Sequence, residues 1–318
     1  NQTSNATNNW ILFIFNNSIT LSTLIITIKH WFGRVKHDKL VVDVVKLRND
    51  YFRNKDIENI FFARYVIVRS AVNFFQLLCG LFYVFTASQN NTIYIYLLAL
   101  VLCFLQSVFF GIENQYFYGI LYISCFYGTL NKDLVAVRTK LNAVATKKLY
   151  CELADEVDLI ASIYRKLFHL EQRLTVLFEP QLILILSCKL IYNVASCFGL
   201  VVFFTDKFHS ENKELITLEI VLLFGAMAVM WLNFNVCEYF SNNAVKVRET
   251  LKSFTELNVI DLRLARSLEM MAIQCSCVVP KVCIGGFFEL NNKRCFQLLI
   301  YIVSTILVLV QYDYINLF

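Results

Sequence analysis

The sequence has few of the residues that interrupt helices, and it carries little charge. Its 318 residues include 2 Pro and 9 Gly, and Asp, Glu, Lys and Arg together make up 17%. Soluble domains carry about 25% charged residues, so an ordinary cytosolic enzyme is disfavoured. Disordered and collagen-like chains are excluded by the same composition.

The residue patterns of catalysis and metal binding are also missing. There is no phosphate-binding glycine loop and no nucleophile motif, and the four His have no ligand spacing. Cys275 and Cys277 are too close together for a paired zinc knuckle, and none of the eleven Cys lies in a predicted outer connection. We therefore predict no enzyme activity, no metal, no cofactor and no nucleic-acid partner.

Hydrophobic residues dominate instead, at 58% of the chain. A helix that crosses the bilayer core of about 30 Å needs roughly 20 mostly apolar residues. The stretches that qualify are residues 10–28, 66–85, 93–112, 182–204, 216–234 and 296–312. The sequence therefore predicts an all-α membrane protein with six spans.

Basic residues gather in alternate connections between these spans. Segments 29–70, 131–180 and 241–297 hold 26 of the 29 Lys and Arg, whereas connections 86–92 and 205–215 hold two. Because positively charged connections stay on the cytosolic side, we place the three basic segments inside.

Glycosylation sequons fall on the opposite side. They start at Asn1, Asn5 and Asn90 and predict modification there, although chance is an alternative in an Asn-rich chain. We then expect both ends of this sequence to face outward, with no signal peptide before the start. We expect a cytosolic N-terminus and one further span before residue 1, giving seven spans with the C-terminus outside. This polarity is the reverse of that of G-protein-coupled receptors, so no G protein is required.

The inner segments show helical periodicity. Apolar residues recur at three- and four-residue steps at Leu134, Val137, Leu141, Val144, Leu159, Ile163, Leu167, Leu170, Leu251, Phe254, Leu257, Ile260, Leu264 and Leu268. Such stripes are buried against other helices, so we expect the membrane helices to continue into a cytosolic layer; independent surface helices are the alternative.

The predicted regions are an outer-facing start, membrane helices and first inner segment at 1–130, a cytosolic segment at 131–180, membrane helices at 181–240, anchor helices at 241–295 and a terminal helix at 296–318.

Lys189 stands within an apolar span. Counted from the outer ends of their spans, Lys189 is about 15 residues deep and Glu113 about 19, which at 1.5 Å per residue differ by about 6 Å. Ionisable groups at this depth are costly and indicate function. We predict that the two side chains pair inside the bundle, with extension of Lys189 to the headgroups as the alternative.

Several polar or aromatic side chains within the spans could contact a small ligand in a cleft between helices. The candidates are Tyr83, Tyr96, Gln106, Tyr192, Asn193 and Trp231. Packing or hydrogen bonding between helices is the alternative for each.

The last span resembles the C-terminal signature of insect gustatory receptors, which is Thr-Tyr, five hydrophobic residues and Gln-Phe. Ser304 and Thr305 stand at the Thr-Tyr positions, Gln311 is retained and Tyr312 replaces Phe. The upstream segment 285–291 resembles the family's sequence segment that leads into the last helix. The resemblance identifies a divergent member of the gustatory receptor family.

This resemblance implies a tetrameric, ligand-gated, non-selective cation channel, whose last helices surround the pore and whose subunits each hold a tastant in the outer half of the bundle. Ser304, Val308 and Gln311 share one helix face and are the predicted pore residues. Thr305, Leu309 and Tyr312 are then predicted to pack against neighbouring helices.

The sequence therefore predicts a multi-pass gustatory receptor in the plasma membrane of a sensory neuron. Its predicted partners are a small tastant, membrane lipid and other subunits of a homo- or heterotetramer. A secondary transporter and a non-conducting scaffold subunit remain as alternatives.

Overall fold

The computed structural model describes the backbone of residues 2–53, 55, 57, 60–87, 93–143, 147–205, 213–256, 261–277, 280–286 and 288–317. Within these ranges, side chains are described except at 2–19, 83–87, 93–99, 102–103, 105–106, 142–143, 147, 202–205, 213–215, 255–256 and 312–317.

The described chain is almost entirely helical, as the composition predicts. Its α-helices are α1 (Gln2–Leu47), α2 (Ile60–Ala87), α3 (Ile93–Ala143), α4 (Lys147–Thr205), α5 (Lys213–Lys252), α6 (Leu262–Cys277) and α7 (Asn292–Leu317). Short π and 3-10 segments, Arg48–Phe52 and Ser253–Glu256, follow α1 and α5. A two-stranded antiparallel hairpin, β1 (Cys283–Ile284) and β2 (Phe288–Glu289), precedes α7.

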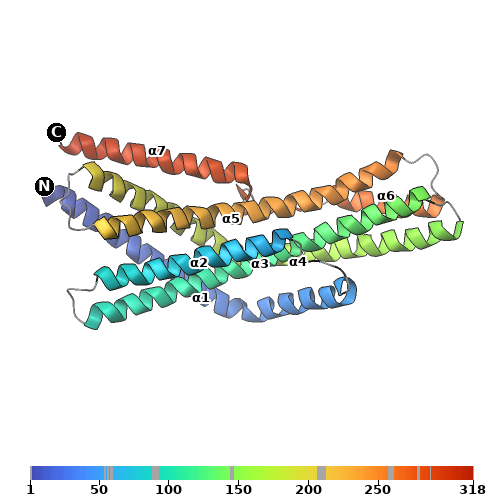
Figure 1. Ribbon diagram of the computed structural model, residues 1–318, viewed down its shortest axis with the longest axis horizontal. Helices are drawn as coiled ribbons and strands as arrows, with labels where there is room; N and C mark the ends of the chain where they lie inside the picture. Colours follow the sequence, from blue (N-terminus) through green and yellow to red (C-terminus); the bar gives the residue numbers. More distant parts are fainter. Residues whose placement is uncertain are drawn as a thin grey trace.

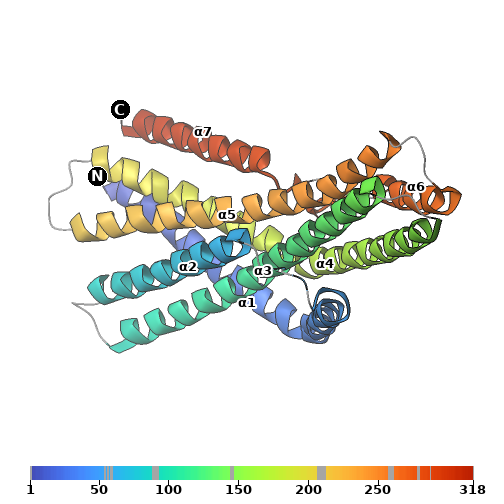
Figure 2. The same ribbon diagram turned by 45° about the vertical axis from the view of Figure 1, so that its right-hand side comes forward.

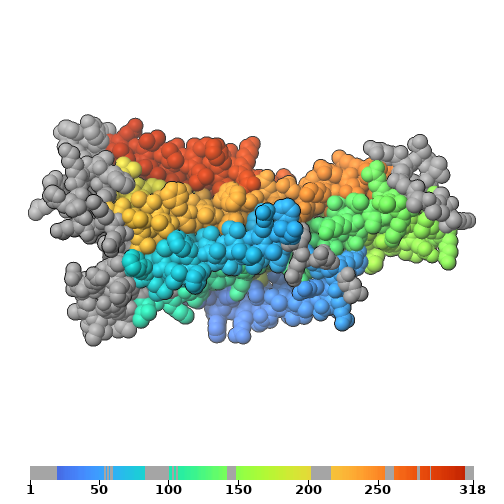
Figure 3. Space-filling model, viewed as in Figure 1, coloured from blue at the N-terminus to red at the C-terminus, as the bar shows by residue number. Residues whose placement is uncertain are grey.

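The helices form an elongated bundle (Figures 1 and 2). At its wide end lie the C-terminal end of α2, the start of α3 and the C-terminal end of α7; at its narrow end lie α6 and the C-terminal end of α3. Helices α3, α4 and α5 run most of the length, whereas α7 covers only the wide half (Figure 3). The wide half therefore holds more helices than the narrow half.

Long apolar helices confirm the membrane-protein prediction. Among the described residues, four helices are long and apolar enough to cross a bilayer, within Ile60–Phe82, Lys148–Val201, Ile216–Lys252 and Asn292–Gln311. They correspond to four of the six predicted spans. The other two, 10–28 and 93–112, include side chains outside the described set.

Most of the predicted apolar stripes are buried in the narrow half. Leu134, Val137 and Leu167 are fully buried. The prediction that Leu159 is buried is wrong, because its side chain is 51% exposed while that of Ile160 beside it is fully buried. The buried face of α4 is therefore shifted by one residue at this point. Val144, Leu257 and Ile260 lie outside the described side chains.

The hairpin before α7 depends on two glycines. Gly285 and Gly286 have φ values of 65° and 72°, in the left-handed region that side chains disfavour. Asn291 then caps α7, because its side-chain oxygen accepts the Arg294 N–H at 2.9 Å. Glu238 of α5 accepts the Asn292 N–H at 2.8 Å. The glycine turn, the Asn291 amide oxygen and the Glu238 carboxylate thus fix the point at which α7 begins.

Candidate functional site

A cluster of charged side chains is buried between four helices in the wide half. Glu113 of α3 pairs with Lys189 of α4, and its other carboxylate oxygen lies 3.2 Å from Arg69 Nη2 of α2. Their exposed fractions are 1% for Glu113, 8% for Lys189 and 0% for Arg69. The structure therefore brings the predicted partners Lys189 and Glu113 together and adds a second cation.

Amide side chains complete this cluster. Asn233 of α5 donates to Glu113 Oε1. Asn114 accepts hydrogen bonds at 2.8 Å from Arg69 Nε and from Asn73 Nδ2. Arg69 also donates to the Val229 carbonyl of α5 at 3.3 Å. The cluster thus joins α2, α3, α4 and α5 through hydrogen bonds and ion pairs inside the bundle.

The cluster holds two cations and one anion, so its formal net charge is +1. Sequence reasoning missed Arg69, because it was counted with the basic inner segment. A usable signal was present: Arg69, Asn73 and Gln76 are spaced i, i+4, i+7, so three polar residues share one face of an apolar helix. All three are buried.

Asn193 lies one turn beyond Lys189 and is fully buried. Neither amide atom of Asn193 has a hydrogen-bond partner within the described residues. Buried amides are normally satisfied, so Asn193 is unusual among the described side chains. Of the other predicted pocket residues, Tyr192 is half-buried and Trp231 is 49% exposed. Tyr83, Tyr96 and Gln106 lie outside the described side chains.

Helix α7 packs along one face only. It contacts α4 and α5, and its well-buried side chains include Cys295 and Ile302. The predicted pore residues Ser304, Val308 and Gln311 are all exposed, Val308 at 63%.

The predicted packing residues Thr305 and Leu309 are half-buried, and the side chain of Tyr312 is outside the described set. One face of α7 is therefore not covered by the described residues of this chain.

The predicted glycosylation sites are not placed: Asn1 lies outside the described backbone, as does Asn90, and the side chain of Asn5 is outside the described set. Among described residues there is no group of three or more His, Cys, Asp or Glu that could hold a metal. The described cysteines are free thiols.

Comparison with known proteins identifies the family. The family profile described as 7tm chemosensory receptor matches residues 1–316. The chain therefore belongs to the seven-transmembrane chemosensory receptor family, which consists of receptors rather than enzymes, and the expected absence of enzyme activity agrees with this.

The curated relatives are Drosophila melanogaster taste receptors. The gustatory receptor for bitter taste 22e is 24% identical over 286 residues, which cover 88% of this chain and 71% of that protein. The putative gustatory receptor 22d is 22% identical, with coverage of 89% and 72%. These matches confirm the predicted resemblance to gustatory receptors.

A solved structure shares the fold. The insect olfactory receptor OR5 from Machilis hrabei superposes with a TM-score of 0.61 at 10% sequence identity, covering 96% of this chain and 82% of that one. Its complex with eugenol superposes with a TM-score of 0.60, covering 94% and 80%. The likeness confirms the predicted chemoreceptor-like architecture.

Proposed function

We propose that this protein is a subunit of a ligand-gated, non-selective cation channel in the plasma membrane, opened by a small tastant. Four subunits surround the pore, each contributing α7. The cytosolic side is the narrow end, where the basic inner segments lie, and the C-terminus faces outward. This assignment rests on family membership and on the geometry of α7.

The observation that carries the proposal is the open apolar face of α7. In the most apolar part of this helix only 11% of the residues are buried, although the helix contacts α4 and α5. Lipid could cover such a face, but lipid gives no reason for Ser304 and Gln311 to lie on it. A central path shared by four copies accounts for both the apolar and the polar positions.

The side chains on this face suit a weakly selective gate. A ring of Val308 side chains forms a hydrophobic constriction that closes by dewetting. A ring of Gln311 amides, one turn nearer the C-terminus, hydrates cations without a fixed charge. Ligand binding then favours the open state through its higher affinity for that state.

The ligand class follows the relatives. One relative is named a receptor for bitter taste, and the olfactory receptor of similar fold was solved with eugenol. A small, mostly apolar compound that forms one or two hydrogen bonds fits these facts. The unpartnered Asn193 amide is the group that we expect to supply such a bond.

Electrophysiology of the whole receptor tests the proposal. Val308→Ser removes the hydrophobic constriction, so we expect a raised resting conductance without ligand. Val303→Ser is the matched control, because Val303 is also exposed, at 57%, but lies about 140° around the helix from Val308. Equal resting conductance in both variants and in the parent would contradict a pore-lining α7.

A transporter is the second candidate, favoured by the buried Arg69–Glu113–Lys189 cluster. It predicts saturable substrate flux without unitary conductance steps. Single-channel recording in a planar bilayer separates the two functions.

A further inference from the structure

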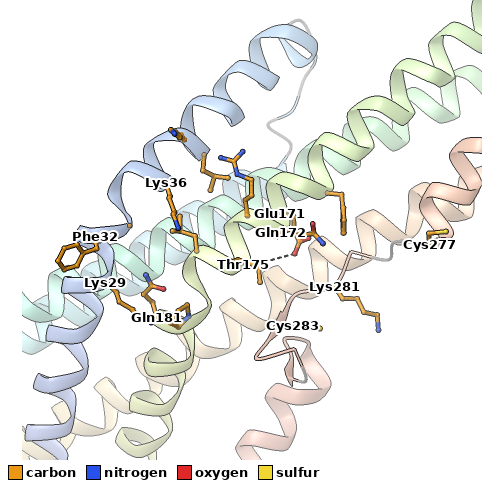
Figure 4. A pocket seen from close by; sticks show the side chains of 18 residues that line it. Lys29, Phe32, Lys36, Glu171, Gln172, Thr175, Gln181, Cys277, Lys281 and Cys283 are labelled. Carbon is orange, nitrogen blue, oxygen red and sulfur yellow. Dashed lines mark hydrogen bonds between the residues drawn. The ribbon is translucent and has the colours of Figure 1, made fainter.

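A cavity of about 1120 Å³ lies between α1, α4 and the β1–β2 hairpin (Figure 4). It is separate from the buried charge cluster and from the open face of α7. Its volume lies slightly above the range of about 300–1,000 Å³ that is typical of sites for drug-sized molecules. Five cationic side chains line it, from three different parts of the chain: Lys29, Lys36, Lys39, Arg173 and Lys281.

The three lysines of α1 are not neutralised. Lys29, Lys36 and Lys39 are exposed and make no hydrogen bond or ion pair with any residue whose side chain is described. The other two cations have partners: Arg173 pairs with Asp43 at 2.5 Å and Lys281 with Glu289 at 3.3 Å. The free positive charge of the cavity therefore comes from α1.

One carboxylate, that of Glu171, lines the cavity opposite these lysines. It is 3% exposed and accepts a hydrogen bond from the Thr175 hydroxyl at 3.1 Å (Figure 4). Because Glu171 is withdrawn from solvent while the lysines are exposed, an entering molecule meets the cations first. The cavity therefore selects for anions.

The spacing of the lysines indicates several anionic groups in one ligand. Lys29 and Lys39 are ten residues apart on one helix, which corresponds to about 15 Å. A single phosphate is too small to reach both. A headgroup with phosphates on different ring positions can contact Lys29 or Lys39 together with Lys36 between them.

The position of the cavity indicates a lipid source. Helix α7 has 26 residues, about 39 Å, and runs from the hairpin to the wide end (Figure 1). Lys281 and Cys283, just before α7, line the cavity, so it lies where α7 leaves the membrane. Phe32 at its edge is 82% exposed, and exposed apolar residues continue along α1 toward the wide end at Leu21, Leu24 and Ile28. Acyl chains can lie along this run while the headgroup occupies the cavity.

We propose that the cavity binds the multiply phosphorylated headgroup of an inner-leaflet lipid, a phosphoinositide. Basic pockets between membrane helices on the cytosolic side recognise such headgroups. The inner-leaflet assignment rests on the proposed topology, but the binding chemistry does not require channel activity. A bound headgroup links α1 and α4 to the hairpin that begins α7, so lipid occupancy holds the base of α7 in place.

Lipid binding to the purified whole receptor tests this proposal without any tastant. The receptor is reconstituted in phosphatidylcholine nanodiscs and titrated with phosphatidylinositol 4,5-bisphosphate. The variant combines Lys29→Gln, Lys36→Gln and Lys39→Gln; the matched control combines Lys46→Gln, Lys166→Gln and Lys246→Gln, which are exposed lysines outside the cavity. At about fivefold per lysine, we expect roughly 100-fold weaker binding by the cavity variant and unchanged binding by the control.

Additional variants and ligands make each outcome of this binding experiment decisive. The triple Lys→Arg variant at 29, 36 and 39 keeps the charge and should retain binding, and elution from a size-exclusion column shows that each variant is folded. Equal weakening in the control triple, or equal binding of phosphatidylserine at matched charge, would overturn the site. Binding of free inositol trisphosphate as tight as that of the lipid would overturn the lipid assignment, because the acyl chains would then contribute nothing to binding. Retained lipid binding without any ligand-evoked current would instead count against the proposed channel function alone.

Discussion

Removing Glu113 should destabilise the protein far more than removing Lys189. Glu113 is the single anion between Arg69 and Lys189. In Glu113→Gln two buried cations lose their counter-charge, whereas Lys189→Met leaves the Arg69–Glu113 pair, whose closest atoms are 3.2 Å apart, electrically balanced. The residual buried charge is therefore +2 in Glu113→Gln and zero in Lys189→Met, although each variant removes one member of the same pair.

The expected magnitudes follow from measured buried pairs. Leaving an uncompensated buried charge lowers the free energy of unfolding by about 3–5 kcal/mol. At about 2 °C per kcal/mol, the lower value known for large domains, Glu113→Gln should lower the melting temperature by roughly 6–10 °C. We expect a shift of under about 2 °C for Lys189→Met.

Thermal unfolding in detergent, followed by fluorescence-detected size exclusion, measures both shifts. The double variant Glu113→Gln with Lys189→Met should recover part of the loss, since it leaves one buried cation rather than two. Similar losses for the two single variants would refute the reasoning, because they would show that the pair acts alone and Arg69 is neutralised elsewhere.

Other predictions concern the start of α7 and the cysteines of α6. Asn291→Ala removes the N-cap and should lower stability by about 1 kcal/mol in the same assay; an unchanged melting temperature would contradict the capping role. Gly286→Ala meets no atom within 4 Å, so only backbone strain of about 1–2 kcal/mol should appear; Ser241→Ala in α5 is a control without that strain. Burial raises the pKa of the Cys275 thiol to about 11, so maleimide at pH 7.5 should label exposed Cys277 and spare Cys275; labelling of Cys275 at an equal rate would contradict this. If Cys277 is cytosolic, an impermeant maleimide should label it only after the membrane is opened.

Apolar runs were sufficient to predict the helical membrane architecture, because a helix in lipid must satisfy its own backbone hydrogen bonds. Depth counting placed Lys189 and Glu113 within about 6 Å of the same level, since each depth depends only on helical rise. Arg69 was missed because it was counted with the basic inner segment 29–70, although it lies about 16 residues from the outer end of the predicted span 66–85, close to the depths of the other two. Leu159 was misassigned because Ile160 beside it satisfies a helical stripe equally well.

The cavity between α1, α4 and the hairpin could not be predicted from the sequence. Its lysines on α1, Glu171 on α4 and Lys281 before the hairpin are far apart in the chain and meet only through packing of α1 on α4. The open face of α7 was predictable as a pattern, through the i, i+4, i+7 spacing of Ser304, Val308 and Gln311. In the proposed channel other subunits cover that face, and a single sequence does not specify them.

Charged-reagent block of a cysteine on α7 tests the central claim most directly. Gln311→Cys and, as control, Val303→Cys are expressed as whole receptors and recorded while a positively charged methanethiosulfonate reagent is applied from outside. Because Gln311 lies on the proposed conduction path and Val303 does not, the reagent should irreversibly block ligand-evoked current through Gln311→Cys and leave Val303→Cys unchanged. Full current through Gln311→Cys after labelling, with incorporation verified by mass spectrometry, would contradict a pore lined by α7.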